Sequence, residues 1–154
     1  MNEVIHVSKK NKLNFTTCKY NHIWVYLSLL TLDEKGNILL DTDEEEKQRI
    51  FMFDTGAQHT LISKMRAEKL GYLYCEHKGK TRVSVGGSIL WCSKIEIPDI
   101  IITNDIIVHK PIILIPDDYD YNKNILGQDI LQLFNYYMDN FSHNIYFDKE
   151  KYGV

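Results

Sequence analysis

Apolar residues in this chain occur in short runs that are separated by turn-forming residues. The first runs, His22–Leu32 and Arg49–Phe53, flank a polar connection in which Ile38–Leu40 is placed to prolong the first hairpin arm. The later runs are rich in Ile, Val, Tyr and Thr, and they are Thr81–Val85, Ile89–Ile97, Ile100–Thr103, Ile106–His109, Ile112–Ile115, Tyr136–Asp139 and Asn144–Phe147. Such runs, with Gly, Pro, Asn and Asp between them, are typical of strands and tight turns. The pattern predicts a mainly β fold.

Helical patterning is confined to two places. Ser63 is a suitable N-cap for Lys64–Leu70, which consists of good helix formers, and Gly71 is a suitable residue after the last turn. A second short helix is expected to begin with Asp129 as its N-cap and to run through Phe134. Two brief helices among many short strands favour a closed or orthogonally packed β structure over alternating βαβ units.

Length and composition limit the possible functions. The 154 residues correspond to one domain, for which we expect residues 20–154, preceded by a polar N-terminal extension over residues 1–19 with at most one short strand. The net charge of -3, with scattered basic residues, gives no electrostatic case for nucleic acid or an anionic membrane. No apolar run is long enough to span a bilayer. Three widely spaced cysteines do not suggest a disulfide framework, so a reducing cytoplasm is expected.

The segment that indicates chemistry is Phe51–Ala57, in which three large apolar residues run directly into Asp54, Thr55 and Gly56. An apolar strand that ends in an acid carries this carboxylate to a sheltered position, where it needs hydrogen-bond donors or a second acid with which to share a proton. Gly56 permits a tight turn and the approach of another backbone. A turn with Asp and Gly also has a purely conformational explanation, so the tripeptide alone decides nothing.

A second motif follows about seventy residues later as Asn124–Leu131, with the sequence Asn-Ile-Leu-Gly-Gln-Asp-Ile-Leu. With both motifs in this order, and with a glycine-bearing hairpin between them, the chain resembles the retropepsin-like aspartic proteases, especially their cellular branch. The resemblance covers residues 22–148. It implies a closed β barrel with a flap hairpin and one or two short helices, assembled as a two-fold homodimer.

The resemblance also implies roles for individual residues. Asp54 matches the catalytic aspartate, Thr55 and Gly56 support the active-site loop together with Ala57, and Gly86 and Gly87 fall at the flap tip that closes over a bound peptide. The sequence departs from the family at Gln58, where a small or acidic polar residue is more common, and in the flap, which lacks the aromatic residue of some relatives.

One catalytic aspartate per chain implies two chains, because this reaction needs two carboxylates that share a proton. The segment Leu39–Asp43 lacks the glycine, so a homodimer is the simplest source of the second acid. Asn144–Phe147 and the N-terminal segment are then candidate interface strands. The expected activity is peptide-bond hydrolysis of a peptide or protein substrate, with no metal or organic cofactor.

Two other functions remain open at this stage. One is a catalytically silent retropepsin-like module that dimerises or binds peptides. The other is a metal-dependent hydrolase that uses the acidic run Asp41–Glu46, which is more simply a solvated loop because consecutive like charges repel each other.

Overall fold

The protein was examined as a computed structural model, which describes residues 11–17, 21–39 and 50–148. Its strands over the first part of the chain are β1 (Lys12–Thr17), β2 (Ile23–Tyr26), β3 (Ser28–Leu29), β4 (Thr31–Leu32), β5 (Ile38–Leu39) and β6 (Ile50–Phe53). Those that follow are β7 (Glu76–Val85), β8 (Ser88–Glu96), β9 (Ile100–Thr103), β10 (Ile106–Val108), β11 (Ile112–Pro116), β12 (Ile125–Leu126), β13 (Asn135–Asp139) and β14 (Asn144–Asp148). The prediction of a mainly β fold is confirmed.

The helices are short, as the sequence predicts. Helix α1 (Lys64–Leu70) begins at the N-cap Ser63, whose side chain accepts a hydrogen bond from Arg66 N, and ends at Gly71 with a left-handed φ of 81°. Tyr72–Tyr74 adds one 3-10 turn. Helix α2 covers Gln128–Leu131, and its N-cap is Gly127. The expectation that Asp129 caps this helix is therefore wrong, because the helix begins before it.

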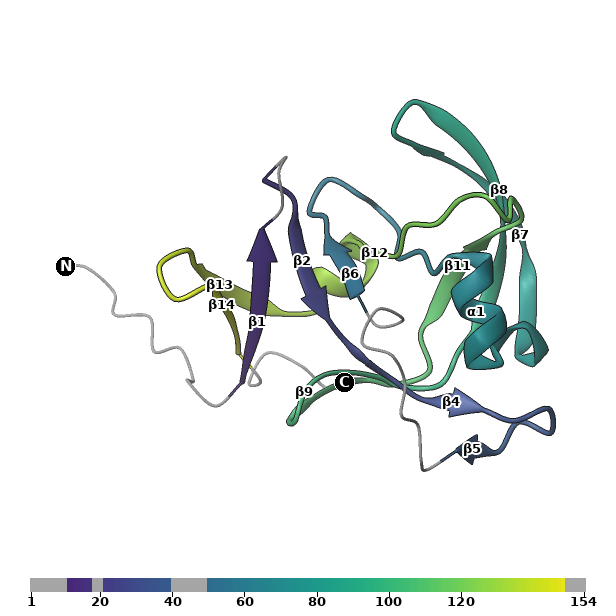
Figure 1. Cartoon of the computed structure of the whole chain (residues 1–154), viewed down its shortest axis with the longest axis horizontal. Helices are drawn as coiled ribbons and strands as arrows, with labels where there is room; N and C mark the ends of the chain where they lie inside the picture. Colours follow the sequence, from purple (N-terminus) through teal and green to yellow (C-terminus); the bar gives the residue numbers. More distant parts are fainter. Residues whose placement is uncertain (1–10, 18–20, 40–49, 149–154) are drawn as a thin grey trace.

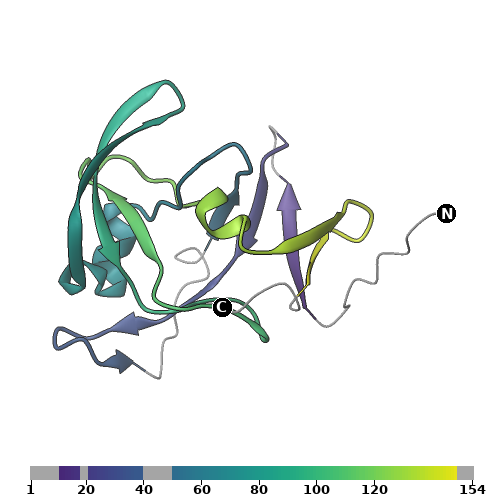
Figure 2. The same ribbon diagram turned by 180° about the vertical axis from the view of Figure 1, so that it is seen from behind.

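The strands form four described sheets. The largest is six-stranded in the order β12-β6-β2-β1-β14-β13, and the smaller ones have the orders β10-β9-β3, β11-β8-β7 and β4-β5. The six-stranded sheet has two different end strands, so within the described residues it is a half-barrel. The expectation of a closed barrel is corrected accordingly. In Figures 1 and 2 the β7–β8 hairpin projects at one end of the molecule and the β13–β14 hairpin lies at the opposite end.

Strand β1 lies inside the largest sheet. Its first half pairs with β14 and its second half with β2, both antiparallel. Lys12–Thr17 is thus the short strand that was expected within the N-terminal extension, and it contributes Leu13 and Phe15 to the core. The division of the chain at residue 19 stays a prediction.

Two clusters of buried apolar side chains support the fold. The larger one joins the six-stranded sheet, α1 and the β9–β10 hairpin, and includes Val25, Phe51, Leu70, Ile100 and Phe147. The smaller one lies beneath the β7–β8 hairpin and consists of Leu61, Leu90, Cys92, Leu114 and Ile125. Strand β6 contacts both clusters, because Phe51 and Phe53 belong to the first and Met52 packs against the second. If this alternation continues, the residue after Phe53 lies on the side of Met52 and the smaller cluster.

Candidate active site

The loop Asp54–Thr60 follows strand β6 and is held by the second motif of the sequence. Strand β12 runs parallel to β6, with Ile125 opposite Met52 and Leu126 opposite Phe53. The amide of Asp54 donates to Leu126 O over 3.1 Å, and Gln128 Nε2 donates to Thr55 O over 2.9 Å. Ile125–Gly127 therefore packs behind this loop. The two sequence motifs are one structural unit.

The Asp54 carboxylate lies half-buried at the beginning of the loop. Its Oδ1 accepts a hydrogen bond of 2.9 Å from the amide of Gly56, and a Cβ at Gly56 would lie 3.3 Å from that oxygen. The amide of Ala57 donates to the backbone oxygen of Asp54 over 3.2 Å, which closes the turn. Thr55 is exposed. The carboxylate is thus oriented by its own loop while part of its surface stays open.

Close backbone contact explains the glycine of the second motif. A Cβ at Gly127 would lie 2.4 Å from His59 O and 3.1 Å from Ala57 O. The φ of Gly127 is −106°, which any residue adopts, so this glycine is required by space and not by its backbone conformation. Any side chain there displaces the Asp54 loop.

Asp129 stabilises the same loop through Thr60, a role that the sequence reading did not identify. Asp129 Oδ1 accepts a 2.6 Å hydrogen bond from Thr60 Oγ1, and its Oδ2 accepts a 3.0 Å bond from Thr60 N. Thr60 Oγ1 in turn accepts from Gly127 N over 3.1 Å. Asp129 is structural, as expected, but it anchors the loop instead of capping the helix. Nothing in the sequence around Thr60 indicates that it pairs with Asp129, which is 69 positions away.

Asn124 fixes the entry into strand β12 and was also missed. Its side chain is buried, accepts from Ser63 N over 2.9 Å and donates to Ile50 O over 3.2 Å. It therefore ties the start of β12 to β6 and to the N-cap of α1. The buried asparagine is explained by its hydrogen bonds to these two other segments. The sequence alone does not show that the three segments lie together.

A groove of about 460 Å³ separates the Asp54 loop from the β7–β8 hairpin. Its lining residues come from both sides and are Asp54, Gly56, Ala57, Gln58, His59, Leu61, Arg82, Val83, Ser84, Val85, Gly86 and Ile125. The structure therefore brings the expected hairpin residue Gly86 and the expected loop residues Asp54, Gly56 and Ala57 to one cavity. Gly87 is at the same hairpin tip but does not line the groove, and neither does Thr55.

The hairpin tip is a two-residue turn. Val85 pairs with Ser88, and both Gly86 and Gly87 have positive φ, 55° and 82°. Two residues with positive φ between paired strands are the geometry of a type I′ turn, for which glycine is favoured. No described atom lies within 4 Å of a Cβ built at either glycine, so the tip is free of neighbours.

Beneath the hairpin, one wall of the groove is apolar. Leu61 and Ile125 are buried there, and Val83 and Val85 pack against them from the hairpin. The buried Leu90 belongs to the same cluster but does not line the groove. Tyr121 packs against the same cluster, and its hydroxyl is buried without a hydrogen-bond partner among the described residues. Burial raises the pKa of Tyr121, and the charges of Cys92 and Asp54 contribute to the rise. The wall therefore adjoins the Asp54 carboxylate and suits an apolar ligand group.

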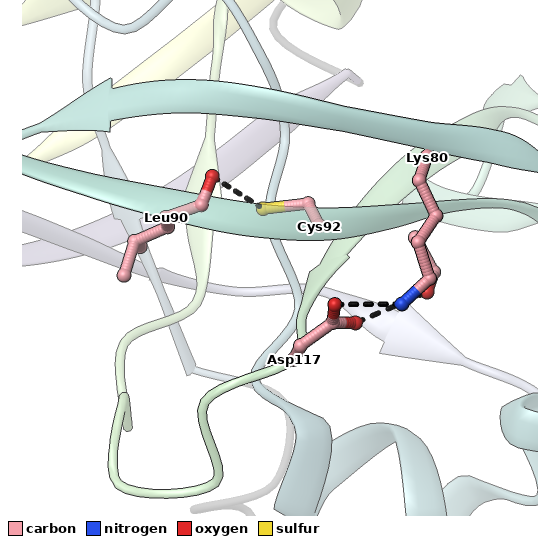
Figure 3. Close-up of polar contacts among 5 residues, drawn as sticks. Lys80, Leu90, Cys92 and Asp117 are labelled. Atoms are coloured by element: carbon pink, nitrogen blue, oxygen red, sulfur yellow. Dashed lines mark hydrogen bonds and ion pairs between the residues drawn. The ribbon is translucent and has the colours of Figure 1, made fainter.

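Asp117 connects the base of the hairpin to the loop after β11. Its carboxylate accepts a 2.7 Å hydrogen bond from Lys80 Nζ of β7 and a 3.2 Å bond from Ser93 Oγ of β8, and its amide donates to Trp91 O over 2.8 Å. Figure 3 shows the Lys80–Asp117 pair beside strand β8. The Lys80 hydrogen bond is the main cause that lowers the pKa of Asp117. One carboxylate therefore holds both strands of the hairpin.

The Lys80–Asp117 pair predicts a pH-dependent contribution to stability. Since the pKa of Asp117 is lower in the folded chain, the contribution is fully present above the ordinary aspartate value of about 3.9 and is lost as the pH falls through the lowered pKa of the folded chain. It is below about 1 kcal/mol, because the two side chains are 60% and 37% exposed. The gap between wild type and Asp117→Asn in urea unfolding should therefore be present at pH 7 and narrow as the pH falls below about 3.9. Asp105→Asn, on an exposed turn, is the control, and a gap that acidification leaves unchanged contradicts the prediction.

The described cysteines do not provide a nucleophile. Burial, with a smaller contribution from Asp117, raises the pKa of Cys92 to about 11, and burial also raises the pKa of Cys75. Cys92 Sγ contacts Leu90 O at 4.0 Å, which Figure 3 shows. A protonated thiol is a poor nucleophile at neutral pH. Cys18 lies outside the described residues.

Residues that could hold a metal are not gathered in the described part of the chain, where no three His, Cys, Asp or Glu side chains form a suitable group. The acidic run Asp41–Glu46 lies outside the described residues. No described helix has both the length and the apolar character that crossing a membrane requires.

Comparison with known proteins identifies the family. Residues 43–133, more than half of the chain, match the family described as gag-polyprotein putative aspartyl protease. The chain belongs to this retropepsin-like aspartyl protease family. Both parts of the loop unit, residues 54–60 and Asn124–Leu131, lie within the matched segment of the chain.

A solved structure shows the same fold. The chain is similar to a retropepsin-like aspartic protease from Rickettsia conorii, with a TM-score of 0.56 and 14% sequence identity over 96% of each chain. At this identity the similarity shows the fold alone. The search of curated proteins finds no match.

Proposed function

We propose that this aspartyl-protease family member is an endopeptidase in which Asp54 of two identical chains activates a water molecule for peptide-bond hydrolysis. The observation that carries the proposal is the position of Asp54, a half-buried carboxylate at the boundary between an apolar wall and an open groove. In the reaction, the ionised member of an aspartate pair takes a proton from water while the protonated member polarises the substrate carbonyl. Thr55, Gly56 and Ala57 support the loop that presents the acid.

The second carboxylate has to come from a second copy of the chain. Among the described residues that line the groove, Asp54 is the only carboxylic acid. Asp129 and Asp117 are each committed to hydrogen bonds elsewhere, with Thr60 and with Lys80. A two-fold axis beside Asp54 would place two identical carboxylates together, where like charges favour a shared proton. The exposed Thr55 hydroxyl is available to the partner loop in this arrangement.

The edge strand of the six-stranded sheet is a better interface candidate than the strand expected from the sequence. Both edges of β14 are occupied, by β1 and by β13, whereas β13 is the last strand of the described sheet. In the adjoining turn, Phe141 is fully exposed at 102%, and Tyr137 of β13 is 54% exposed. Free strand edges with exposed aromatic residues favour pairing with another chain. We therefore propose β13 and Phe141 as part of the dimer interface.

The groove suits an extended peptide. In an antiparallel hairpin, residues alternate between those that bond to the partner strand and those that direct N–H and C=O outward. Val85 is paired next to the turn, so Ser84 and Arg82 are the residues of β7 that direct their backbone groups away from β8. A peptide strand could therefore pair with this edge. With Gly86 and Gly87 at its tip, the hairpin would act as the flap.

The test of this function is the loss of activity when wild-type and inactive chains are mixed. Wild type and Asp54→Asn are co-refolded in different ratios at constant total concentration, and cleavage of an unstructured protein is measured with and without a pepstatin-type inhibitor. If both chains contribute an acid, activity falls with the square of the wild-type fraction, to about one quarter in an equal mixture. A linear fall to about one half would mean that a single chain holds the complete site. Wild type that cleaves nothing at any pH would support the silent peptide-binding module instead.

A further inference from the structure

Strand β7 carries three cationic side chains, of which two are neutralised by carboxylates. Lys78 Nζ lies 2.8 Å from Glu76 Oε1, and Lys80 Nζ lies 2.7 Å from Asp117 Oδ2. Arg82, the third, has no carboxylate partner in the described part of the chain. It is also the one of the three that lines the groove. Val83 and Val85 face the apolar wall, so alternation along the strand places the Arg82 side chain on the other face of the hairpin, beside the exposed Trp91. An unpaired cation therefore lies at the edge of β7 with which the proposed peptide pairs.

The Arg82 side chain is held in position by Trp91. The two residues are directly opposite each other in the β7–β8 ladder, and Arg82 Cζ lies 5.4 Å from the centre of the Trp91 ring. A cation over an aromatic face is stabilised without the use of its hydrogen-bond donors. The planar N–H groups of the guanidinium thus remain available to a carboxylate, which they match in geometry.

The spacing along β7 separates Arg82 from the hairpin tip. Arg82 precedes the tip residue Gly86 by about 13 Å of strand, at about 3.3 Å per residue. With the cleaved bond beneath the tip, a peptide paired with β7 would place near Arg82 the side chain three or four residues from that bond.

We propose that Arg82, positioned by Trp91, forms a subsite for an acidic side chain of the peptide substrate, three or four residues from the bond that is cleaved. The inference rests on the proposed function, because it assumes a peptide that lies along the groove. In a two-fold dimer the subsite occurs twice, once toward each end of the bound peptide. The substrate class is then an extended peptide with an apolar centre and acidic residues on both flanks.

Binding and cleavage are measured separately in the test. The probes are ten-residue peptides with two central apolar residues. Each peptide carries Glu, Gln or Lys at one flanking position or at both. Affinity is measured with Asp54→Asn, and cleavage with wild type. Glu at the Arg82 positions should bind about three- to fivefold more tightly than Gln, as expected for a partly exposed ion pair. Glu at both ends should gain about tenfold, and high salt should reduce the difference.

Two substitutions and one control identify the residue responsible. Adding Arg82→Gln to Asp54→Asn should remove the preference for Glu, and adding Arg82→Glu should replace it with a preference for Lys. Lys94→Gln removes an exposed charge from β8 outside the groove and should leave the preference unchanged.

The possible failures can be told apart. Equal affinity for Glu and Gln peptides, a preference that survives in Arg82→Gln, or no binding of any peptide would overturn the acidic subsite. An Arg82-dependent preference in a wild type that cleaves no peptide would support the subsite and contradict the proposed endopeptidase. Cleavage without any preference would support the endopeptidase and overturn the subsite.

Discussion

Asp54→Asn should abolish peptide hydrolysis while it leaves the fold intact. The amide that replaces the carboxylate cannot take a proton from water, and in a symmetric dimer the substitution removes both acids at once. We expect a loss of about 10⁴-fold in kcat, the upper range for proton transfer by side chains. Asn retains a carbonyl oxygen that can accept the 2.9 Å hydrogen bond from Gly56 N, so the loop should keep its conformation. Cleavage of an unstructured protein and thermal unfolding are the two measurements.

The matched control for this prediction is Asp105→Asn. Asp105 lies exposed in the turn between β9 and β10 and does not line the groove. The control undergoes the same chemical change, and it should retain full activity. If Asp54→Asn kept more than about one hundredth of the wild-type rate, Asp54 would not be the catalytic acid.

Gly127→Ala should strongly destabilise the protein, because the added methyl group has no space beside the Asp54 loop. The new Cβ would lie 2.4 Å from His59 O and 2.6 Å from His59 C, both backbone atoms. Because neither can rotate away, the Asp54 loop or α2 has to move. We expect a loss of about 3 kcal/mol in the free energy of unfolding, measured in urea. Activity should fall as well, since the displaced loop carries Asp54.

Gly36→Ala is the contrasting control for Gly127→Ala. Gly36 has a left-handed φ of 83°, but no described atom lies within 4 Å of the Cβ position. Its substitution therefore costs only backbone strain, about 1 kcal/mol, and leaves the groove unaffected. If both variants lost the same free energy of unfolding and kept their activity, the prediction would be wrong. The close contact at Gly127 would then be relieved without any effect on the site.

Local patterns in the sequence were sufficient to predict most elements. The alternation of apolar runs and turn residues predicted β6, the second half of β7, β8 to β11, β13 and β14, but not the two-residue strand β12. Ser63 and Gly71 marked the ends of α1 because both act on the backbone next to them. The roles predicted for Asp54 and Gly86 came from the family resemblance, which rests on short motifs whose residues are neighbours in the chain. These features depend on interactions over a few residues, which a sequence displays directly.

Features that depend on contacts between distant segments could not be predicted in this way. The Asp129–Thr60 pair joins residues 69 positions apart, and the free charge of Arg82 becomes visible only when the partners of Lys78 and Lys80 are known. The closed barrel was inferred from the family resemblance, whereas the described strand order is open. Asp129 itself illustrates the limit, because its residue type fits a helix cap and its actual partner lies elsewhere.

The parallel contact between β6 and β12 also determines when the site can exist. Thr55 and Gln128, whose hydrogen bond helps to hold the loop, are 73 positions apart. Contacts this distant in sequence form only after a large entropic cost of loop closure has been met. A chain emerging from the ribosome therefore carries Asp54 long before it has the segment that orients this acid. The proposed hydrolytic activity therefore requires the second motif as well as the first, and a nascent chain that ends before residue 124 lacks it.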